Sequence, residues 1–281
     1  PLTVQTTLDA KLQKSVEHIM ADHSVQDGAV VILDSQTSEI MAMASSPSPV
    51  EEDFSHPSWN NKALKRYTPG SVFKVVVAAA ALEEELTTLD TTYECPGSIP
   101  GTSFKCWKEG GHGKITFAQA FYESCNIVFG ELAAQLGDEL LEQYADKLGL
   151  LQLNGWHRDA FFHLTDFKQL DREEQGQVFD SKRTQVERSD IQYLRQTGIG
   201  QLDVQLTPLA VANMMAAISR GGSKYQVKAV NAIEYQMGGT FYLFPDEPMA
   251  GESITPYTAY QLQQLLRGVV TDGTAQGLKD A

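Results

Sequence analysis

Apolar residues along the chain form two kinds of pattern, short runs typical of β-strands and a spacing typical of amphipathic helices. Residues 3–23 begin with a strand-like run and continue with apolar positions at helical spacing, which predicts a short strand followed by an amphipathic helix. Residues 29–33 and 39–44 are short apolar runs separated by a polar turn, and they predict a β-hairpin in a covered sheet. A helix is expected over residues 71–85, where a strongly apolar run follows a Pro-Gly turn.

The centre of the chain is predicted to be mainly helical, and strand-like runs return towards its end. Further helices are expected at residues 116–136, 138–148, 207–219 and 255–270, and strands near 226–235 and 240–244. Irregular structure is expected at 45–59 and 91–114, and a charged, loop-rich surface insertion at 151–195. Strands at both ends indicate an α/β or α+β domain, in which a helical block of roughly residues 61–222 is inserted between sheet segments.

Composition and charge restrict the partners. The chain has 281 residues, of which 42% are hydrophobic and 21% charged, as in folded globular proteins. Its net charge is −14, and it has no cluster of basic residues, so we expect no nucleic-acid partner. The longest strongly apolar run, residues 75–82, is too short to span a membrane.

The cysteines and histidines give little support for a bound metal or cofactor. Cys95, Cys106 and Cys125 are too few for a disulfide scaffold, and their spacing contains no CxxC pair. The histidines show no HExxH pattern, so the sequence predicts no metal site and no cofactor. Cys95 and Cys106 flank a loop rich in Gly and Pro, and a disulfide between them in an oxidising compartment stays open.

Ser71 and Lys74 form the first pattern with a chemical interpretation. Residues three positions apart share one face of a helix, so the hydroxyl and the amine can meet. Pro69-Gly70 places Ser71 at a helix N-terminus, where N–H groups stabilise an alkoxide and lower the pKa of a nearby amine. A neutral Lys74 could then accept the proton of Ser71 during acyl transfer. The alternative is a capping serine followed by an exposed lysine.

Ser124-Cys125-Asn126 is the second such pattern. In a loop or an extended turn, the Ser124 hydroxyl and the Asn126 carboxamide can face one cleft. The hydroxyl can relay a proton between Lys74 and a leaving amine. The amide can bond both a C=O and an N–H group of a peptide substrate. The alternative is a helix cap before the apolar residues 127–129.

The order of these two motifs resembles that of the penicillin-binding proteins, serine acyl-transferases that share SxxK with the serine β-lactamases. Other stretches that resemble their transpeptidase domain are residues 27–46, 60–74, 106–113, 198–201, 207–209, 268–270 and 273–275. The resemblance covers nearly the whole chain except residues 151–195. It implies a β-lactamase/transpeptidase-like fold, with an antiparallel sheet flanked by helices and a helical subdomain.

The resemblance also implies a D,D-transpeptidase mechanism. Ser71 would attack the carbonyl between the two terminal D-alanines of a peptidoglycan stem peptide, and Lys74 would be the base. Ser124 would relay the proton, Asn126 would orient the donor peptide, and the backbone N–H of Ser71 would form half of the oxyanion hole.

The implied partners are D-Ala-D-Ala donor peptides, amine acceptor peptides, β-lactam antibiotics and cell-wall assembly proteins. The implied location is extracytoplasmic, at the bacterial cytoplasmic membrane, with the anchor in a segment outside this chain.

The family's third motif, Lys-(Thr/Ser)-Gly on an edge strand, is not found. Thr271-Asp272-Gly273 is the nearest match, but its aspartate stands where the substrate carboxylate requires a cation. We therefore expect that residues 1–281 are a transpeptidase domain that ends before this motif and lacks its C-terminal strands. Losing one oxyanion donor costs on the order of a hundredfold to a thousandfold in rate, so slow acylation is expected.

Two alternatives stay open at the level of the sequence. A D,D-carboxypeptidase, a serine β-lactamase or a β-lactam sensor would share the Ser–Lys chemistry and differ in how the acyl-enzyme is resolved. A scaffold protein of the same fold would bind cell-wall assembly partners without catalysis.

Overall fold

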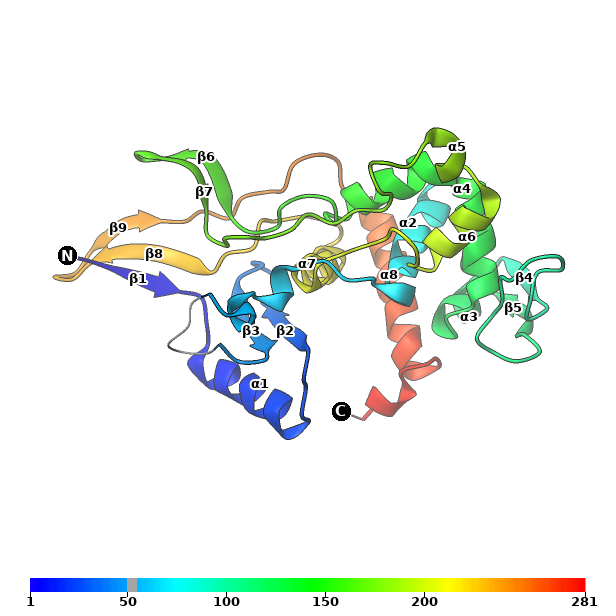
Figure 1. Ribbon diagram of the computed structural model, residues 1–281, viewed down its shortest axis with the longest axis horizontal. Helices are drawn as coiled ribbons and strands as arrows, with labels where there is room; N and C mark the ends of the chain where they lie inside the picture. Colours follow the sequence, from blue (N-terminus) through cyan, green and yellow to red (C-terminus); the bar gives the residue numbers. More distant parts are fainter. Residues whose placement is uncertain (50–54, 281) are drawn as a thin grey trace. The chain divides into compact units, whose positions relative to one another are not determined.

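The computed structural model of the chain describes residues 1–49 and 55–280, so residues 50–54, in the middle of the expected 45–59 loop, lie outside the described part. The chain divides into two compact units, each built from separate parts of the sequence (Figure 1). Unit 1 comprises Pro1–Tyr67, Gly149–Gly176 and Leu206–Ala250, and unit 2 comprises Thr68–Leu148, Gln177–Gln205 and Gly251–Ala281. No helix in the described part is both long and apolar enough to cross a membrane.

Unit 1 contains an antiparallel sheet in the order β1-β8-β9. The strands are β1 (Leu2–Thr6), β8 (Val230–Tyr235) and β9 (Thr240–Leu243). β1 pairs with a strand from near the other end of the sequence, with Leu2 opposite Tyr235 and Gln5 opposite Ala232 (Figure 1). The early and late strands expected from the sequence therefore meet in one sheet.

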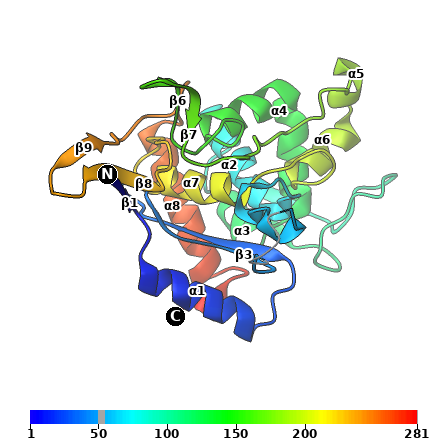
Figure 2. The ribbon, with the colours of Figure 1, turned by 60° about the vertical axis from the view of Figure 1, so that its left-hand side comes forward.

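A helix and a hairpin form a second part of unit 1. These elements are α1 (Ala10–Asp22), β2 (Gly28–Leu33) and β3 (Ile40–Ser46). Val16 and Met20 of α1 pack against Ala42 and Ala44 of β3, and Figure 2 shows α1 running beside β3. Asp9 caps the helix by accepting hydrogen bonds from two backbone N–H groups of its first turn. The order of strand, helix and hairpin predicted from the periodicity is confirmed.

The prediction of a loop-rich insertion at 151–195 is wrong for residues 157–168, which form a hairpin, and for residues 185–188 and 191–195, which are helical. The hairpin consists of β6 (His157–Phe161) and β7 (Leu164–Lys168). Trp156 is fully buried beside it and packs edge-on against Phe161 and Phe244, at centroid distances of 5.9 and 4.9 Å. Phe244, which is distant in sequence, thus helps to cover this hairpin, and the local charge pattern does not reveal this contact.

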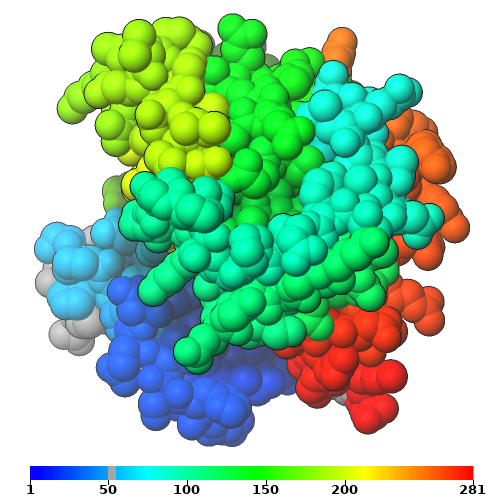
Figure 3. Space-filling model, turned by 90° about the vertical axis from the view of Figure 1, so that its right-hand side faces the viewer, coloured from blue at the N-terminus to red at the C-terminus, as the bar shows by residue number. Residues whose placement is uncertain are grey.

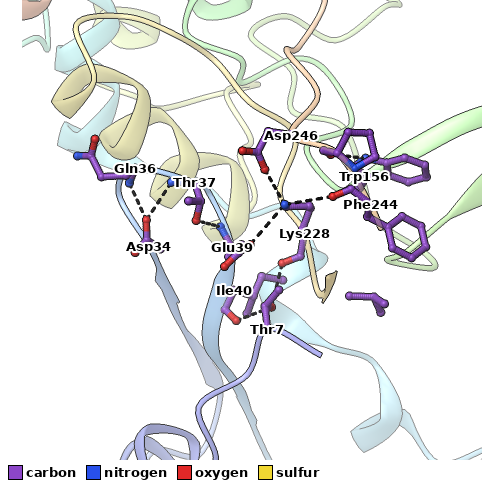
Figure 4. Close-up of polar contacts among 12 residues, drawn as sticks. Thr7, Asp34, Gln36, Thr37, Glu39, Ile40, Trp156, Lys228, Phe244 and Asp246 are labelled. Carbon is purple, nitrogen blue, oxygen red and sulfur yellow. Dashed lines mark hydrogen bonds and ion pairs between the residues drawn. The ribbon is translucent and has the colours of Figure 1, made fainter. Parts of the chain in front are cut away.

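Unit 1 also buries a charged side chain. Lys228 is 4% exposed, and its Nζ lies 3.3 Å from Glu39 Oε1 and 2.5 Å from Asp246 Oδ1 (Figure 4). The same Nζ donates a hydrogen bond to the carbonyl of Phe244 at 3.4 Å. These partners offset the cost of removing the ammonium from water, and they join β3 to the segment that enters β8.

Unit 2 is mainly helical. Its helices are α2 (Lys74–Glu83), α3 (Phe117–Tyr122), α4 (Asn126–Lys147), α5 (Gln185–Arg188), α6 (Ile191–Gly198) and α8 (Pro256–Thr271), and a 3-10 turn (Gly70–Phe73) precedes α2. Every residue of α2 from Lys74 to Leu82 is buried, and α2 packs against α4 and α8. A helix that is apolar on all sides must be covered on all sides, which makes α2 the centre of this unit.

Helix boundaries agree with the sequence where local signals are strong. Helix α7 (Pro208–Ser219) of unit 1 and helix α8 of unit 2 each begin at a proline that follows a capping threonine, within one residue of the prediction. The single helix predicted over 116–136 is wrong, because the chain is interrupted at residues 123–125 between α3 and α4. Residues 149–176, inside the block expected at 61–222, belong to unit 1.

A pair of short strands bounds a long connection in unit 2. β4 (Thr92–Cys95) and β5 (Gly113–Thr116) are antiparallel, with Cys95 opposite Gly113. The connecting residues 96–112 are largely exposed and cover part of the face of unit 2 that Figure 3 presents. The irregular structure expected over 91–114 is confirmed for this connection but not for the strands at its ends.

Close backbone contacts in unit 2 fix the turn that precedes α2. The N–H of Gly70 donates to the carbonyl of Gly200 at 3.1 Å. Gly200 has a φ of +74°, and a Cβ atom there would lie 1.9 Å from the carbonyl oxygen of Gly70. Only a residue without a side chain permits this approach.

We therefore expect Gly200→Ala to destabilise the protein more than Gly101→Ala. Gly101 has a matching φ of +75° with no atom near its Cβ position, so its alanine variant meets only the left-handed conformational cost. The clash at position 200 should lower the free energy of unfolding by about 1–3 kcal/mol more, which urea titration measures. Equal effects of the two substitutions would show that the contact with Gly70 does not constrain the fold.

Candidate active site

Ser71 lies in the turn that leads into α2. It belongs to the 3-10 turn Gly70–Phe73, and the α-helix begins at Lys74, later than the sequence predicts. Gly70 adopts a φ of +59°, a left-handed conformation that glycine reaches without strain. Ser71 is exposed, so a substrate can reach its hydroxyl, and early-turn N–H groups of this kind are available to an oxyanion.

Lys74 is buried at the start of α2, with only 3% of its surface exposed. Its Nζ donates to Ser124 O at 2.7 Å, to Ser124 Oγ at 2.9 Å and to Asn126 Oδ1 at 2.8 Å. The structure thus brings three of the four residues expected at the site into direct contact. The alternative of an exposed lysine beside a capping serine is wrong, because Lys74 is buried and Pro69 is the residue at the cap position.

The interruption between α3 and α4 presents Ser124 and Asn126 to this lysine. Ser124 has a φ of 51°, and this conformation directs both its carbonyl and its hydroxyl to the same ammonium. Cys125 is the N-cap of α4 but makes no side-chain capping bond, so the alternative of a simple helix cap is wrong. Asn126 Nδ2 donates to the carbonyl of Lys105 at 3.2 Å, which orients the carboxamide.

Burial governs the protonation of Lys74. It lowers the pKa of the ammonium from 10.5 to about 8, while negative charge on Cys125 or Cys106 acts in the opposite direction. The three acceptors are a carbonyl, a hydroxyl and an amide, and neutral groups of this kind do not compensate for lost hydration as a carboxylate would. At pH 7 about a tenth of the side chains would be neutral, roughly 300 times more than with the ordinary pKa.

Four potential metal ligands lie together next to this turn. One ligand atom from each of Cys95, Cys106, His112 and Cys125 lies within 4.8 Å of the others. All three cysteines are free thiols, so the disulfide left open for Cys95 and Cys106 is not formed in this structure. Burial raises the pKa of the Cys125 thiol. For Cys106, burial is opposed by N–H groups of Lys108 and Asn126 that donate to the sulfur, and the net effect lowers its pKa.

The stretch that superficially resembles the third motif is not a strand. Helix α8 ends at Thr271, and the N–H of Thr274 donates to the carbonyl of Tyr122 at 3.1 Å. A Cβ atom at Gly273 would lie 2.3 Å from that same carbonyl oxygen. Residues 271–274 therefore close the end of a helix against α3 and present no cationic edge.

Sequence reasoning placed Gly70 in the turn before Ser71, but it did not identify the contact of Gly70 with Gly200 or the grouping of the cysteines with His112. The two glycines have no functional side chain, and the close contact between their backbones is visible only in the folded structure. The four potential ligands come from β4, the connection after it and the N-cap of α4, so no local spacing could group them.

Comparison with known proteins places these features in a family. The family model described as penicillin-binding protein transpeptidase domain matches residues 28–281. Stage V sporulation protein D of Bacillus subtilis (strain 168) is 30% identical over 290 residues, which cover 98% of this chain and 42% of that protein. Peptidoglycan D,D-transpeptidase PbpA of Mycobacterium tuberculosis (strain ATCC 25618 / H37Rv) is 29% identical over 246 residues, which cover 78% and 46%.

A solved structure shares the fold. Penicillin-binding protein A from M. tuberculosis, in its imipenem acyl-enzyme complex, superposes with a TM-score of 0.80 at 24% identity and covers 98% of this chain and 65% of that one. The mixed α/β fold class expected from the sequence is confirmed by this likeness. The chain spans less than half the length of the two curated relatives. On the family model's match over residues 28–281, the chain belongs to the penicillin-binding protein transpeptidase domain family.

Proposed function

We propose that this chain carries the catalytic centre of a peptidoglycan D,D-transpeptidase, a serine acyl-transferase. The observation that supports this most strongly is the burial of Lys74 against Ser124 and Asn126, directly after the exposed Ser71. The proposal agrees with the activity named for the M. tuberculosis relative, peptidoglycan D,D-transpeptidase.

In the first half of the proposed reaction, Ser71 Oγ attacks the carbonyl carbon between the two D-alanines of a stem peptide. Lys74 Nζ takes the hydroxyl proton, and the carbonyl oxygen becomes an oxyanion that the N–H of Ser71 stabilises. The C–N bond then breaks, D-alanine leaves with a proton on its amine, and the peptide remains as an ester on Ser71. An amine of a neighbouring stem attacks this ester in the second half, which forms the cross-link and restores the serine.

Ser124 and Asn126 fit supporting roles in these steps. Ser124 Oγ lies 2.9 Å from Lys74 Nζ, so it can pass the proton from the lysine towards the leaving amine. Asn126 Nδ2 carries two hydrogens, of which one is donated to the carbonyl of Lys105. We assign the second hydrogen to a carbonyl of the donor peptide, which would fix that peptide beside Ser71.

β-Lactams would react at the same place, because their strained amide mimics the D-Ala-D-Ala bond and opens on attack by Ser71. The proposed partners are therefore donor and acceptor stem peptides, β-lactam antibiotics and proteins of cell-wall assembly. The proposed location is extracytoplasmic, at the bacterial cytoplasmic membrane, where this substrate is found.

Incubation with a fluorescent penicillin should label the chain covalently at Ser71. We expect one adduct per chain, because a single serine is the proposed nucleophile. Peptide mass spectrometry after proteolysis identifies the labelled residue, and Ser71→Ala should abolish the label.

Ser103→Ala is the matched control, because Ser103 is an exposed serine elsewhere in unit 2. This variant should be labelled at the same rate and to the same extent as the unaltered chain. Labelling that persists in Ser71→Ala at the same rate would refute the assignment of the nucleophile.

The rate of acylation should depend on pH through Lys74. The lysine must be neutral to accept a proton, so the rate should rise roughly tenfold per pH unit below pH 8. It should level off above the pKa of about 8 to which burial lowers the ammonium. Stopped labelling reactions at a series of pH values measure this profile.

Lys74→Arg tests the same point, because a guanidinium keeps the charge but cannot lose its proton at these pH values. This variant should be acylated very slowly at every pH, whereas Lys114→Arg, at an exposed lysine elsewhere in unit 2, should retain the unaltered profile. A pH-independent rate in the unaltered chain would contradict the role of Lys74 as base.

A further inference from the structure

We propose that Cys95, Cys106, His112 and Cys125 form a tetrahedral zinc site in unit 2. The ligand atoms of these four residues already lie within 4.8 Å of one another. The site is distinct from the acyl-transfer residues, and its existence does not depend on the proposed catalytic function.

Two of the distances between ligand atoms match the edges of a zinc tetrahedron, and the others do not exceed 4.8 Å. Zinc binds Cys Sγ at about 2.3 Å and His nitrogen at about 2.0–2.1 Å, which places two sulfurs about 3.8 Å apart and a sulfur and a nitrogen about 3.6 Å apart. Cys106 Sγ lies 3.9 Å from Cys125 Sγ and 3.5 Å from His112 Nδ1. A metal ion would therefore require displacements of only a fraction of an ångström at these two edges.

The sulfurs are shielded from solvent, as in the closed sites that hold a structural zinc ion. Cys95 and Cys125 are fully buried, and Cys106 is nearly so. A metal ion bound among them would therefore be held by protein ligands alone.

His112 lacks a strong partner without a metal. Its Nδ1 faces the sulfur of Cys106 at 3.5 Å, which is a weak hydrogen bond at best. Its Nε2 is buried and has no hydrogen-bond partner among residues 1–49 and 55–280. Trp107 packs edge-on against the ring at 5.6 Å and holds it in place beside the sulfurs. A metal at Nδ1 would use the lone pair that the fold directs to the cluster.

The donor set identifies the metal and argues against a disulfide. Three thiolates and one imidazole in a closed tetrahedron are the ligands of structural zinc sites, whereas calcium and magnesium require oxygen ligands. A disulfide would join two of the sulfurs and leave the third thiol and the ring of His112 outside the bond. Zinc engages all four groups.

The position of the site gives it a mechanical role. Cys95 ends β4, Cys106 and His112 lie in the connection to β5, and Cys125 stands between Ser124 and Asn126. One ion would thus fasten the long exposed connection and the turn that contacts Lys74. We infer that the metal holds this turn in place and takes no part in bond breaking, because a site with four protein ligands has no open position.

Elemental analysis of the unaltered chain is the direct test. The chain is purified under reducing conditions without chelator and dialysed against buffer with one equivalent of Zn²⁺ and then against metal-free buffer. We expect about one zinc per chain, and we expect Cys95→Ser and His112→Gln to lose it. His18→Gln is the matched control, since His18 is an exposed histidine on α1, and it should retain the zinc.

Measurements on the unaltered chain cover the case in which ligand variants fail to fold. Replacement of zinc by Co²⁺ should give the strong visible absorption of a tetrahedral cobalt–thiolate centre. Removal of metal with a chelator should lower the melting temperature and change the fluorescence of Trp107, whose indole N–H donates to Glu123 O at 2.8 Å. Added Zn²⁺ should restore both values.

Two results would overturn the proposal. One is a folded chain with all three thiols reduced that retains no Zn²⁺ and shows no cobalt–thiolate spectrum. The other is a metal-free protein, isolated from an oxidising compartment, in which mass spectrometry finds a disulfide among Cys95, Cys106 and Cys125. Neither result bears on labelling of Ser71 by penicillin, so failure here and failure of the proposed function are distinguishable.

Discussion

The geometry of the site depends on holding one ammonium group away from water. Lys74 is buried at the start of α2 and contacts three oxygens, none of which carries a charge. Leaving a buried charge without its partners costs about 3–5 kcal/mol. This cost holds the turn at residues 124–126 in contact with the start of α2. The same arrangement keeps the pKa of Lys74 low, because neutral acceptors orient the amine without compensating for its lost hydration. The burial of Lys74 thus accounts both for the constraint on the fold and for the low pKa of the amine.

The neighbouring segments of unit 2 are held by different physical means. The turn before Ser71 is fixed by backbone contact between Gly70 and Gly200, where no side chain fits. The turn at residues 124–126 is fixed by hydrogen bonds to Lys74 and by its proximity to the buried sulfurs and His112. The nucleophile and the residues that serve it are therefore positioned by separate sets of contacts. Most of the constraint comes from atoms that take no part in bond breaking.

Local signals made a large part of the fold predictable. Thr207-Pro208 fixed the start of α7 to one residue, and the periodicity of residues 3–23 and 29–44 gave the strand, helix and hairpin of unit 1. The interruption at residues 123–125 was not predictable, because apolar residues continue on both sides of it and its conformation depends on contact with Lys74. Residues 157–168 appeared loop-like because their hairpin is covered in part by Phe244, which is remote in sequence. For the site, the sequence supplied the reactive side chains, whereas the glycine contact and the sulfur cluster arise from long-range packing.

The backbone of Ser124 limits which amino acids can occupy its position. Its φ of 51° lies in the left-handed region, where β-branched residues are strongly disfavoured. Threonine, the other aliphatic alcohol, would supply the hydroxyl but would force the backbone out of this region and withdraw the carbonyl from Lys74. Glycine would accept the backbone but remove the hydroxyl. Serine has the hydroxyl and also tolerates the left-handed backbone, so it is the aliphatic alcohol that this position accepts.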